Sequence, residues 1–80
     1  MNDKTRSILD RFPDKRDMMI SLMAKAPEFL AICEDHDQCT KALEYWSLSK
    51  EPEAESRANE YRNLIRELEE EIVQALAENQ

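Results

Sequence analysis

Apolar or weakly polar residues recur at alternating steps of three and four positions along two long segments of the chain. In segment 27–48 they are Phe29, Ile32, His36, Cys39, Leu43 and Trp46. In segment 53–78 they are Ala54, Ala58, Tyr61, Ile65, Leu68, Ile72 and Ala75. Such spacing is typical of a heptad repeat, in which one helix packs along another. The pattern predicts two long helices that meet along these two core seams.

Three prolines mark where helices are expected to begin. Pro13, Pro27 and Pro52 are each followed by an acidic residue. Proline suits the first helical position, where its missing N–H is not needed, and an acid in the first turn faces the positive end of the helix dipole. Helices are therefore expected to begin near 13, 27 and 52. Residues 4–11 are a candidate for one more short helix, and residues 1–12 are otherwise a flexible end.

The link between the two long helices, residues 49–51, is short, and short links make neighbouring helices antiparallel. Leu64, Val73 and Leu76 broaden the second stripe, as expected of a helix in a bundle. We therefore predict an all-α protein with a single domain over residues 1–80. Its centre is an antiparallel hairpin of about 27–48 and 53–78, covered by one or more short N-terminal helices.

The methionine-rich segment 18–23 is apolar nearly all round. It predicts either a helix that covers the hairpin or an exposed docking surface, since methionine suits both. The apolar stripes exceed what two helices can cover, which predicts self-association, with a two-fold dimer as the commonest form. The candidate interface residues are Met19, Leu22, Met23, Leu30, Tyr45 and Leu48.

Composition and charge exclude several functions. The absence of glycine removes Gly-rich loops that cradle phosphates. The net charge of −7 argues against direct nucleic-acid binding. Residues 1–25 hold six basic and four acidic residues, so this end is expected to lean against the acidic remainder. No uncharged run approaches the roughly 20 residues of a membrane span, and the chain is expected to be cytoplasmic, with reduced cysteines.

Several charged residues lie at helical spacing. Glu53 with Arg57, and Asp37 with Lys41, are expected to pair one turn apart. Arg66 is expected to reach Glu69 or Glu70. The run of three glutamates at 69–71 is interpreted as a face in contact with solvent.

Cys33, His36 and Cys39 form the only cluster in the sequence that suggests a metal or thiol site. A structural zinc site normally needs four ligands, so the favoured interpretation assigns no metal and no cofactor. Cys39 is then a small core residue, and His36 is a polar seam residue that fixes register. Ser21 and Ser47 lie in ordinary helical contexts, and a small hairpin offers little concave pocket. The protein is therefore not expected to be an enzyme.

The stretch Phe12-Pro13, Ile20-Ser21-Leu22, Phe29 and Glu34-Asp35-His36-Asp37 resembles the YdcH-like family of small bacterial helical-hairpin proteins. The likeness covers about residues 12–48, and it departs from the family by one inserted residue in the Glu-His-Asp stretch. The chain is also similar to other small bacterial proteins with the segments Phe29, Cys33-Glu34-Asp35, Glu60-Tyr61-Arg62 and Glu67-Leu68-Glu69. Both resemblances imply a bacterial helical hairpin, and neither implies a known activity.

The leading hypothesis for function is a non-enzymatic protein-interaction module that self-associates and has a protein partner still to be identified. One alternative is a metal- or thiol-linked sensor that uses Cys33, His36 and Cys39. The other is an acidic regulator that occupies the basic surface of a nucleic-acid-binding partner.

Overall fold

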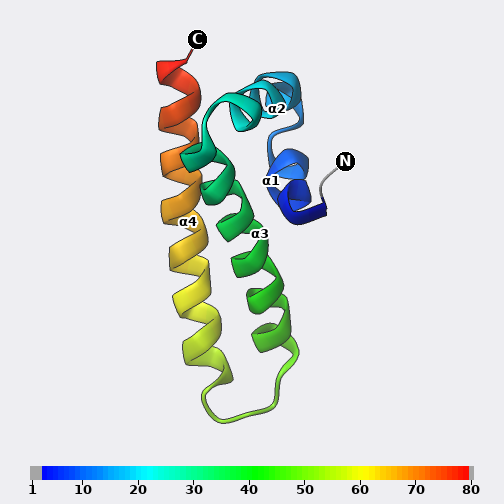
Figure 1. The fold of residues 1–80 in the computed structure, drawn as a ribbon. Coiled ribbons are helices and arrows are strands. Elements are labelled where there is room, and N and C mark those ends of the chain that lie inside the picture. The colour runs from blue at the N-terminus through cyan, green and yellow to red at the C-terminus, as the bar shows by residue number, and fades with distance from the viewer. Residues whose placement is uncertain (1–2, 80) are drawn as a thin grey trace.

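The computed structural model describes residues 3–79, and its regular elements are all helical (Figure 1). The four α-helices are α1 (Arg6–Arg11), α2 (Arg16–Lys25), α3 (Pro27–Leu48) and α4 (Ala54–Glu78). Two short 3-10 turns, Asp3–Thr5 and Pro13–Lys15, precede α1 and α2. The predicted all-α class is confirmed.

The two long helices, α3 and α4, run side by side in opposite directions and form the predicted hairpin (Figure 1). Pro27 is the first residue of α3, and it holds Ala26 in an extended conformation that separates α3 from α2. At the other end α3 stops at Leu48 and is followed by Ser49, whose hydroxyl accepts a hydrogen bond from the backbone N–H of Glu51 at 3.1 Å. The helix start expected at Pro52 is shifted, because Pro52 lies in the turn before α4.

The N-terminal helices pack mainly against α3, beside its first half (Figure 1). The α-helix expected to start at Pro13 instead begins at Arg16, because Pro13 opens a single 3-10 turn. Residues 4–11 are helical in two parts, a 3-10 turn followed by α1. The covering layer therefore leaves the far half of the hairpin as two helices. We call this half, residues 41–68, the distal arm.

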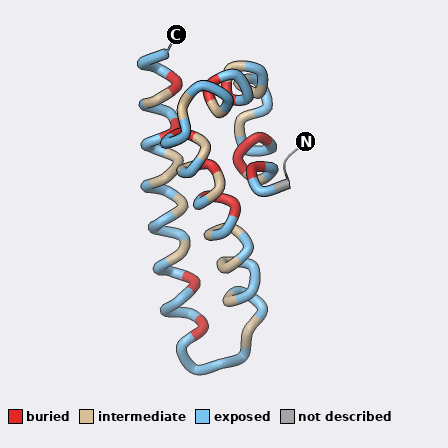
Figure 2. The backbone as a smooth tube through the Cα atoms, viewed as in Figure 1, coloured by how far each residue is buried: buried red, intermediate tan, exposed pale blue. Residues whose placement is uncertain are grey.

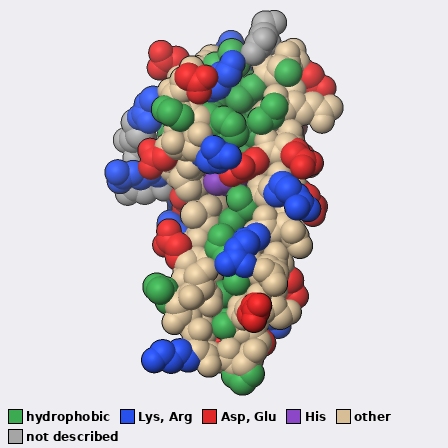
Figure 3. All heavy atoms as spheres, turned by 180° about the vertical axis from the view of Figure 1, so that it is seen from behind, with side chains coloured by type: hydrophobic (Ala, Val, Ile, Leu, Met, Phe, Trp, Pro, Cys, Tyr) green, Lys and Arg blue, Asp and Glu red, His purple; other side chains and the backbone are tan. Residues whose placement is uncertain are grey.

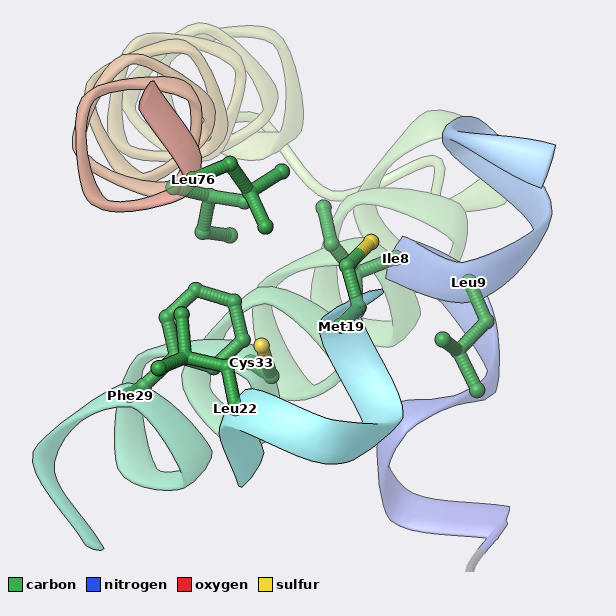
Figure 4. Close-up of a cluster of buried hydrophobic side chains, with 8 residues drawn as sticks. Ile8, Leu9, Met19, Leu22, Phe29, Cys33 and Leu76 are labelled. Atoms are coloured by element: carbon green, nitrogen blue, oxygen red, sulfur yellow. The ribbon is translucent and has the colours of Figure 1, made fainter. Parts of the chain in front are cut away.

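The hydrophobic core lies at the end of the molecule where all four helices meet. Its side chains come from each of the helices and point toward one another (Figure 4). The buried residues of this cluster are Ile8, Leu9, Met19, Leu22, Phe29, Cys33, Ile72 and Leu76. In the distal arm, which the structure describes throughout, the buried residues are the small Ala54 and Ala58 (Figure 2). Burial is thus concentrated at one end of the hairpin.

The structure favours one of the two interpretations of the methionine-rich segment. Met19 is fully buried and Leu22 is 9% exposed, so α2 covers the hairpin, and these two residues were wrong as interface candidates. Met23 is half-buried and packs against the core. Leu30 is also half-buried.

The predicted seam residues are all buried or half-buried. Phe29, His36 and Ile72 are buried, and the half-buried ones are Ile32, Cys39, Leu43, Trp46, Tyr61, Ile65 and Leu68. The broadening of the second stripe is correct only for Leu76, since Leu64 and Val73 are exposed. They were misassigned because the covering helices pack mainly against α3 and leave these parts of α4 open.

Candidate functional site

His36 is the centre of a buried polar network at the place where α1, α3 and α4 meet. The residue is 3% exposed, with Nδ1 at 2.9 Å from the Ser7 hydroxyl and Nε2 at 2.9 Å from Oε2 of Glu69. An ionised carboxylate can only accept, so Nε2 carries a proton. In the neutral ring Nδ1 then accepts from the Ser7 hydroxyl. One side chain from α3 thereby connects α1 to α4.

Charged side chains surround this network. Arg11 of α1 places Nε at 3.5 Å from Oε2 of Glu69. Asp37 accepts the backbone N–H of Ser7 at 3.4 Å and pairs with Lys41 at 2.8 Å. The basic N-terminal segment therefore does lean on an acidic residue of the hairpin, and together these contacts hold α1 to both long helices.

The sequence predicted one of these pairs and missed others. The Asp37–Lys41 pair is confirmed. Glu69 is not part of a solvated face, because its side chain is 21% exposed and pairs with Arg11 and His36 instead of Arg66. The expected Glu53–Arg57 pair is replaced by one between Arg57 and Glu60 at 3.3 Å.

The chain of hydroxyl, imidazole and carboxylate has the order of an activated serine nucleophile. Its surroundings do not suit that chemistry. The backbone N–H of Ser7 already donates to Asp37, and a carboxylate at this place opposes the oxyanion that forms during acyl transfer. We therefore interpret the network as a clamp that fixes the covering helices. Ser21 and Ser47, the serines considered from the sequence, are both exposed.

The two cysteines differ in environment, and the sequence analysis named only Cys39 as a core residue. Cys33 is fully buried in the core, whereas Cys39 is half-buried. Burial, followed by the nearby Glu34 charge, raises the pKa of the Cys33 thiol to about 12. Burial and the charge of Asp35 raise the pKa of Cys39 as well. Within residues 3–79, no group of three or more His, Cys, Asp or Glu side chains is arranged to hold a metal ion.

These environments predict slow and unequal thiol chemistry. In a variant with Cys39→Ser, the remaining Cys33 thiol should react with a disulfide reagent only as fast as the protein unfolds. In a variant with Cys33→Ala, Cys39 should react directly from the folded state, since the reactive species is an accessible thiolate. Equal rates for the two variants, at a denaturant concentration that leaves both folded, would contradict the assignment.

The raised pKa of Cys33 also sets the sign of a pH effect. The folded state holds this proton more tightly than the unfolded state, in which the pKa is 9.0. The stabilisation is thus complete below about pH 9 and is lost as the pH rises toward 12. The difference in unfolding free energy between wild type and Cys33→Ala should shrink over this window, as measured by urea titration.

The distal arm exposes large apolar side chains that no covering helix shields. Its large seam residues are only half-buried, while Tyr45 is 58% exposed and Leu48 is 85% exposed. The rings of Tyr45 and Trp46 lie edge to face with centroids 5.0 Å apart. Seen from behind, hydrophobic side chains extend along the middle of the hairpin above and below the histidine (Figure 3). The arm is the candidate interaction surface.

A shallow hollow of about 430 Å³ lies between the end of α1 and the outer side of α4. Phe12, Val73 and Ala77 give it an apolar lining, and the Arg11 guanidinium lies 5.5 Å from the centre of the Phe12 ring. Its two arginines and two glutamates balance in charge, so the hollow does not favour a ligand of either sign.

Comparison with protein-family models, curated protein sequences and solved structures finds no match to this chain. The resemblance to the YdcH-like family therefore stays a prediction from the residues quoted above. No helix within the described part of the chain is long and apolar enough to cross a membrane.

Proposed function

We propose that this protein is a non-enzymatic protein-interaction module that binds its partner through the distal arm. One observation carries the proposal. In residues 41–68 the buried side chains are those of two alanines, while Tyr45, Leu48 and Leu64 are exposed and the large seam residues are half-buried. Each apolar side chain left in water forfeits part of the roughly 25 cal/mol per Å² that burial supplies. A partner that covers the arm recovers this free energy.

The other half of the molecule, where α1 and α2 pack on the hairpin, differs from the distal arm. There the covering helices close the hairpin, and the clamp around His36 fixes them in place. The longest uncovered stretch of the hairpin is thus the distal arm, and it offers the aromatic residues Tyr45 and Trp46, a residue class enriched among interface anchors.

The alternatives gain less support. A thiol or metal sensor needs reachable ligands, whereas Cys33 is buried and both ring nitrogens of His36 are hydrogen-bonded. An acidic regulator would use the exposed carboxylates of the C-terminal segment, such as Glu70, Glu71 and Glu78, and would leave the apolar side chains of the distal arm without a role. We propose that the module works in the reducing cytoplasm, where Cys33 and Cys39 would stay as free thiols.

Site-specific photo-crosslinking in the native cells tests the proposal. A photoreactive residue at position 48, in the distal arm, should give a discrete adduct whose partner is identified by mass spectrometry. Adding Tyr45→Glu to the same chain should suppress that adduct. The matched control carries the photoreactive residue at position 20, since Ile20 is also exposed, at 42%, but lies on α2. No adduct at position 48, or the same adducts at both positions, would contradict the proposal.

A further inference from the structure

We infer that the partner bound by the distal arm is a second copy of this chain, paired across a two-fold axis to form a four-helix bundle. The inference rests on the proposed function, because it names the partner of the same surface. It is carried by three features of the arm: its charge balance, its apolar stripe and its size.

Charge is distributed so that two copies can meet at the distal arm without a large net repulsion, which is not true of the C-terminal segment. The distal arm holds five basic and six acidic residues, although the whole chain has a net charge of −7. Residues 69–80 hold four acidic and no basic residues. Like charges that face each other across an interface repel, and this repulsion disfavours the complex. Two nearly neutral arms avoid this cost, whereas two acidic ends do not.

The same distribution argues against a strongly basic partner for the arm. Electrostatic attraction would direct such a partner to the acidic C-terminal segment, since complementary potentials steer association. The arm has mixed charges on its outer sides, including the exposed pair of Arg57 with Glu60 at 3.3 Å. The arm combines exposed apolar side chains with nearly balanced charge, in contrast to the acidic C-terminal segment.

The shape of the arm suits a helical bundle. Two antiparallel helices expose a stripe on each face, and a second hairpin laid against that stripe completes a four-helix bundle. In a two-fold contact the same residues serve on both sides, so one set of anchors is used twice. Tyr45 and Leu48, three residues apart on one side of the end of α3, supply two exposed anchors, and Leu64 of α4 is a third exposed apolar residue of the arm.

The area required is available. A standard interface buries about 800 Å² per partner, which is about one seventh of the 5600 Å² surface of this chain. The distal arm comprises 28 of the 80 residues and projects along the long axis of a molecule measuring 44 × 24 × 22 Å. A contact of this size therefore fits on one face of the arm without involving the covering helices.

Sedimentation equilibrium of the purified full-length chain tests the inference. The wild type is expected at twice the chain mass of 9.4 kDa. Tyr45→Glu and Leu48→Glu should each raise the dissociation constant by about tenfold or more, as expected when an interface anchor is replaced by a charge. Both residues are exposed in the single chain, so helicity measured by circular dichroism should be unchanged. Ile20→Glu is the matched control and should leave the dimer intact.

Salt provides a second measurement on the same samples. The dimer should persist between low and high ionic strength, because screening weakens contacts between net charges more than apolar ones. A wild type that sediments as a monomer, or a dimer weakened by Ile20→Glu and not by the two arm variants, would overturn the inference. If the wild type is a monomer but position 48 still crosslinks to another protein, the proposed function stands and only the second copy is wrong. If neither contact is found, both fail.

Discussion

Replacing Ile72 with aspartate is expected to abolish the folded state. Ile72 is fully buried on the core side of α4, at 0% solvent exposure, and it belongs to the cluster that joins all four helices. An unpaired charge at such a position costs several kcal/mol, and the total stability of a domain is only about 5–15 kcal/mol. A chain of 80 residues lies toward the marginal end of that range, because small domains bury a smaller fraction of their surface.

Val73→Asp provides a matched control one residue along the same helix. Val73 is 51% exposed, so the same substitution there should change stability by no more than about 0.5 kcal/mol. Helicity and thermal melting by circular dichroism distinguish the two variants. Leu68→Asp should fall between them, because Leu68 is central in the predicted seam but only half-buried in the structure. A melting temperature for Ile72→Asp equal to that of Val73→Asp would show that this core is wrongly assigned.

The hairpin could be predicted from the sequence because its cause is local and repeated. Alternating steps of three and four positions mark one helical face over many turns, and Pro27 separates α3 from α2 by a steric effect that depends only on its neighbours. The short link then leaves an antiparallel arrangement as the natural solution. These features do not depend on how the rest of the chain packs, so they were confirmed.

The polar network could not be predicted in the same way. Ser7 and Arg11 lie on a helix of six residues whose position is fixed by packing against α3. Nothing in the sequence spacing relates them to His36 or Glu69, which are about thirty residues or more away. Glu69 stands in a run of three glutamates, and only the tertiary contact distinguishes it from the other two.

The cysteines show how the N-terminal helices change the burial that the heptad pattern predicts for α3 and α4 alone. The seam of α3, extrapolated from heptad spacing, runs through Cys39 and does not include Cys33. The covering helices pack beside the first half of α3 and bury Cys33 completely. A periodic pattern identifies the face toward one neighbour, but the second face of the same helix depends on where the N-terminal segment folds.

Replacing His36 with leucine is expected to lower the free energy of unfolding by about 1–3 kcal/mol, the usual cost of leaving a buried polar group without its partner. The substitution keeps the size of the side chain but removes both ring nitrogens, each of which makes a hydrogen bond of 2.9 Å. Ser7 then loses its acceptor. Glu69 faces an apolar group while retaining Arg11 at 3.5 Å, which keeps the loss below that of the Ile72 variant.

The double variant His36→Leu with Glu69→Leu provides the decisive comparison. Replacing both partners of a buried hydrogen bond by apolar groups of similar shape can be nearly neutral, so the double variant should be more stable than His36→Leu alone. Urea unfolding of the wild type, of His36→Leu, of Glu69→Leu and of the double variant gives the coupling energy between the two side chains. For groups in direct contact this energy is about 0.5–3 kcal/mol. The exposed pair Arg57 and Glu60, replaced by alanine in a parallel cycle, should couple by less than about 1 kcal/mol. Additive losses at His36 and Glu69 would mean that the network does not act as a clamp and that α1 is held by its apolar contacts alone.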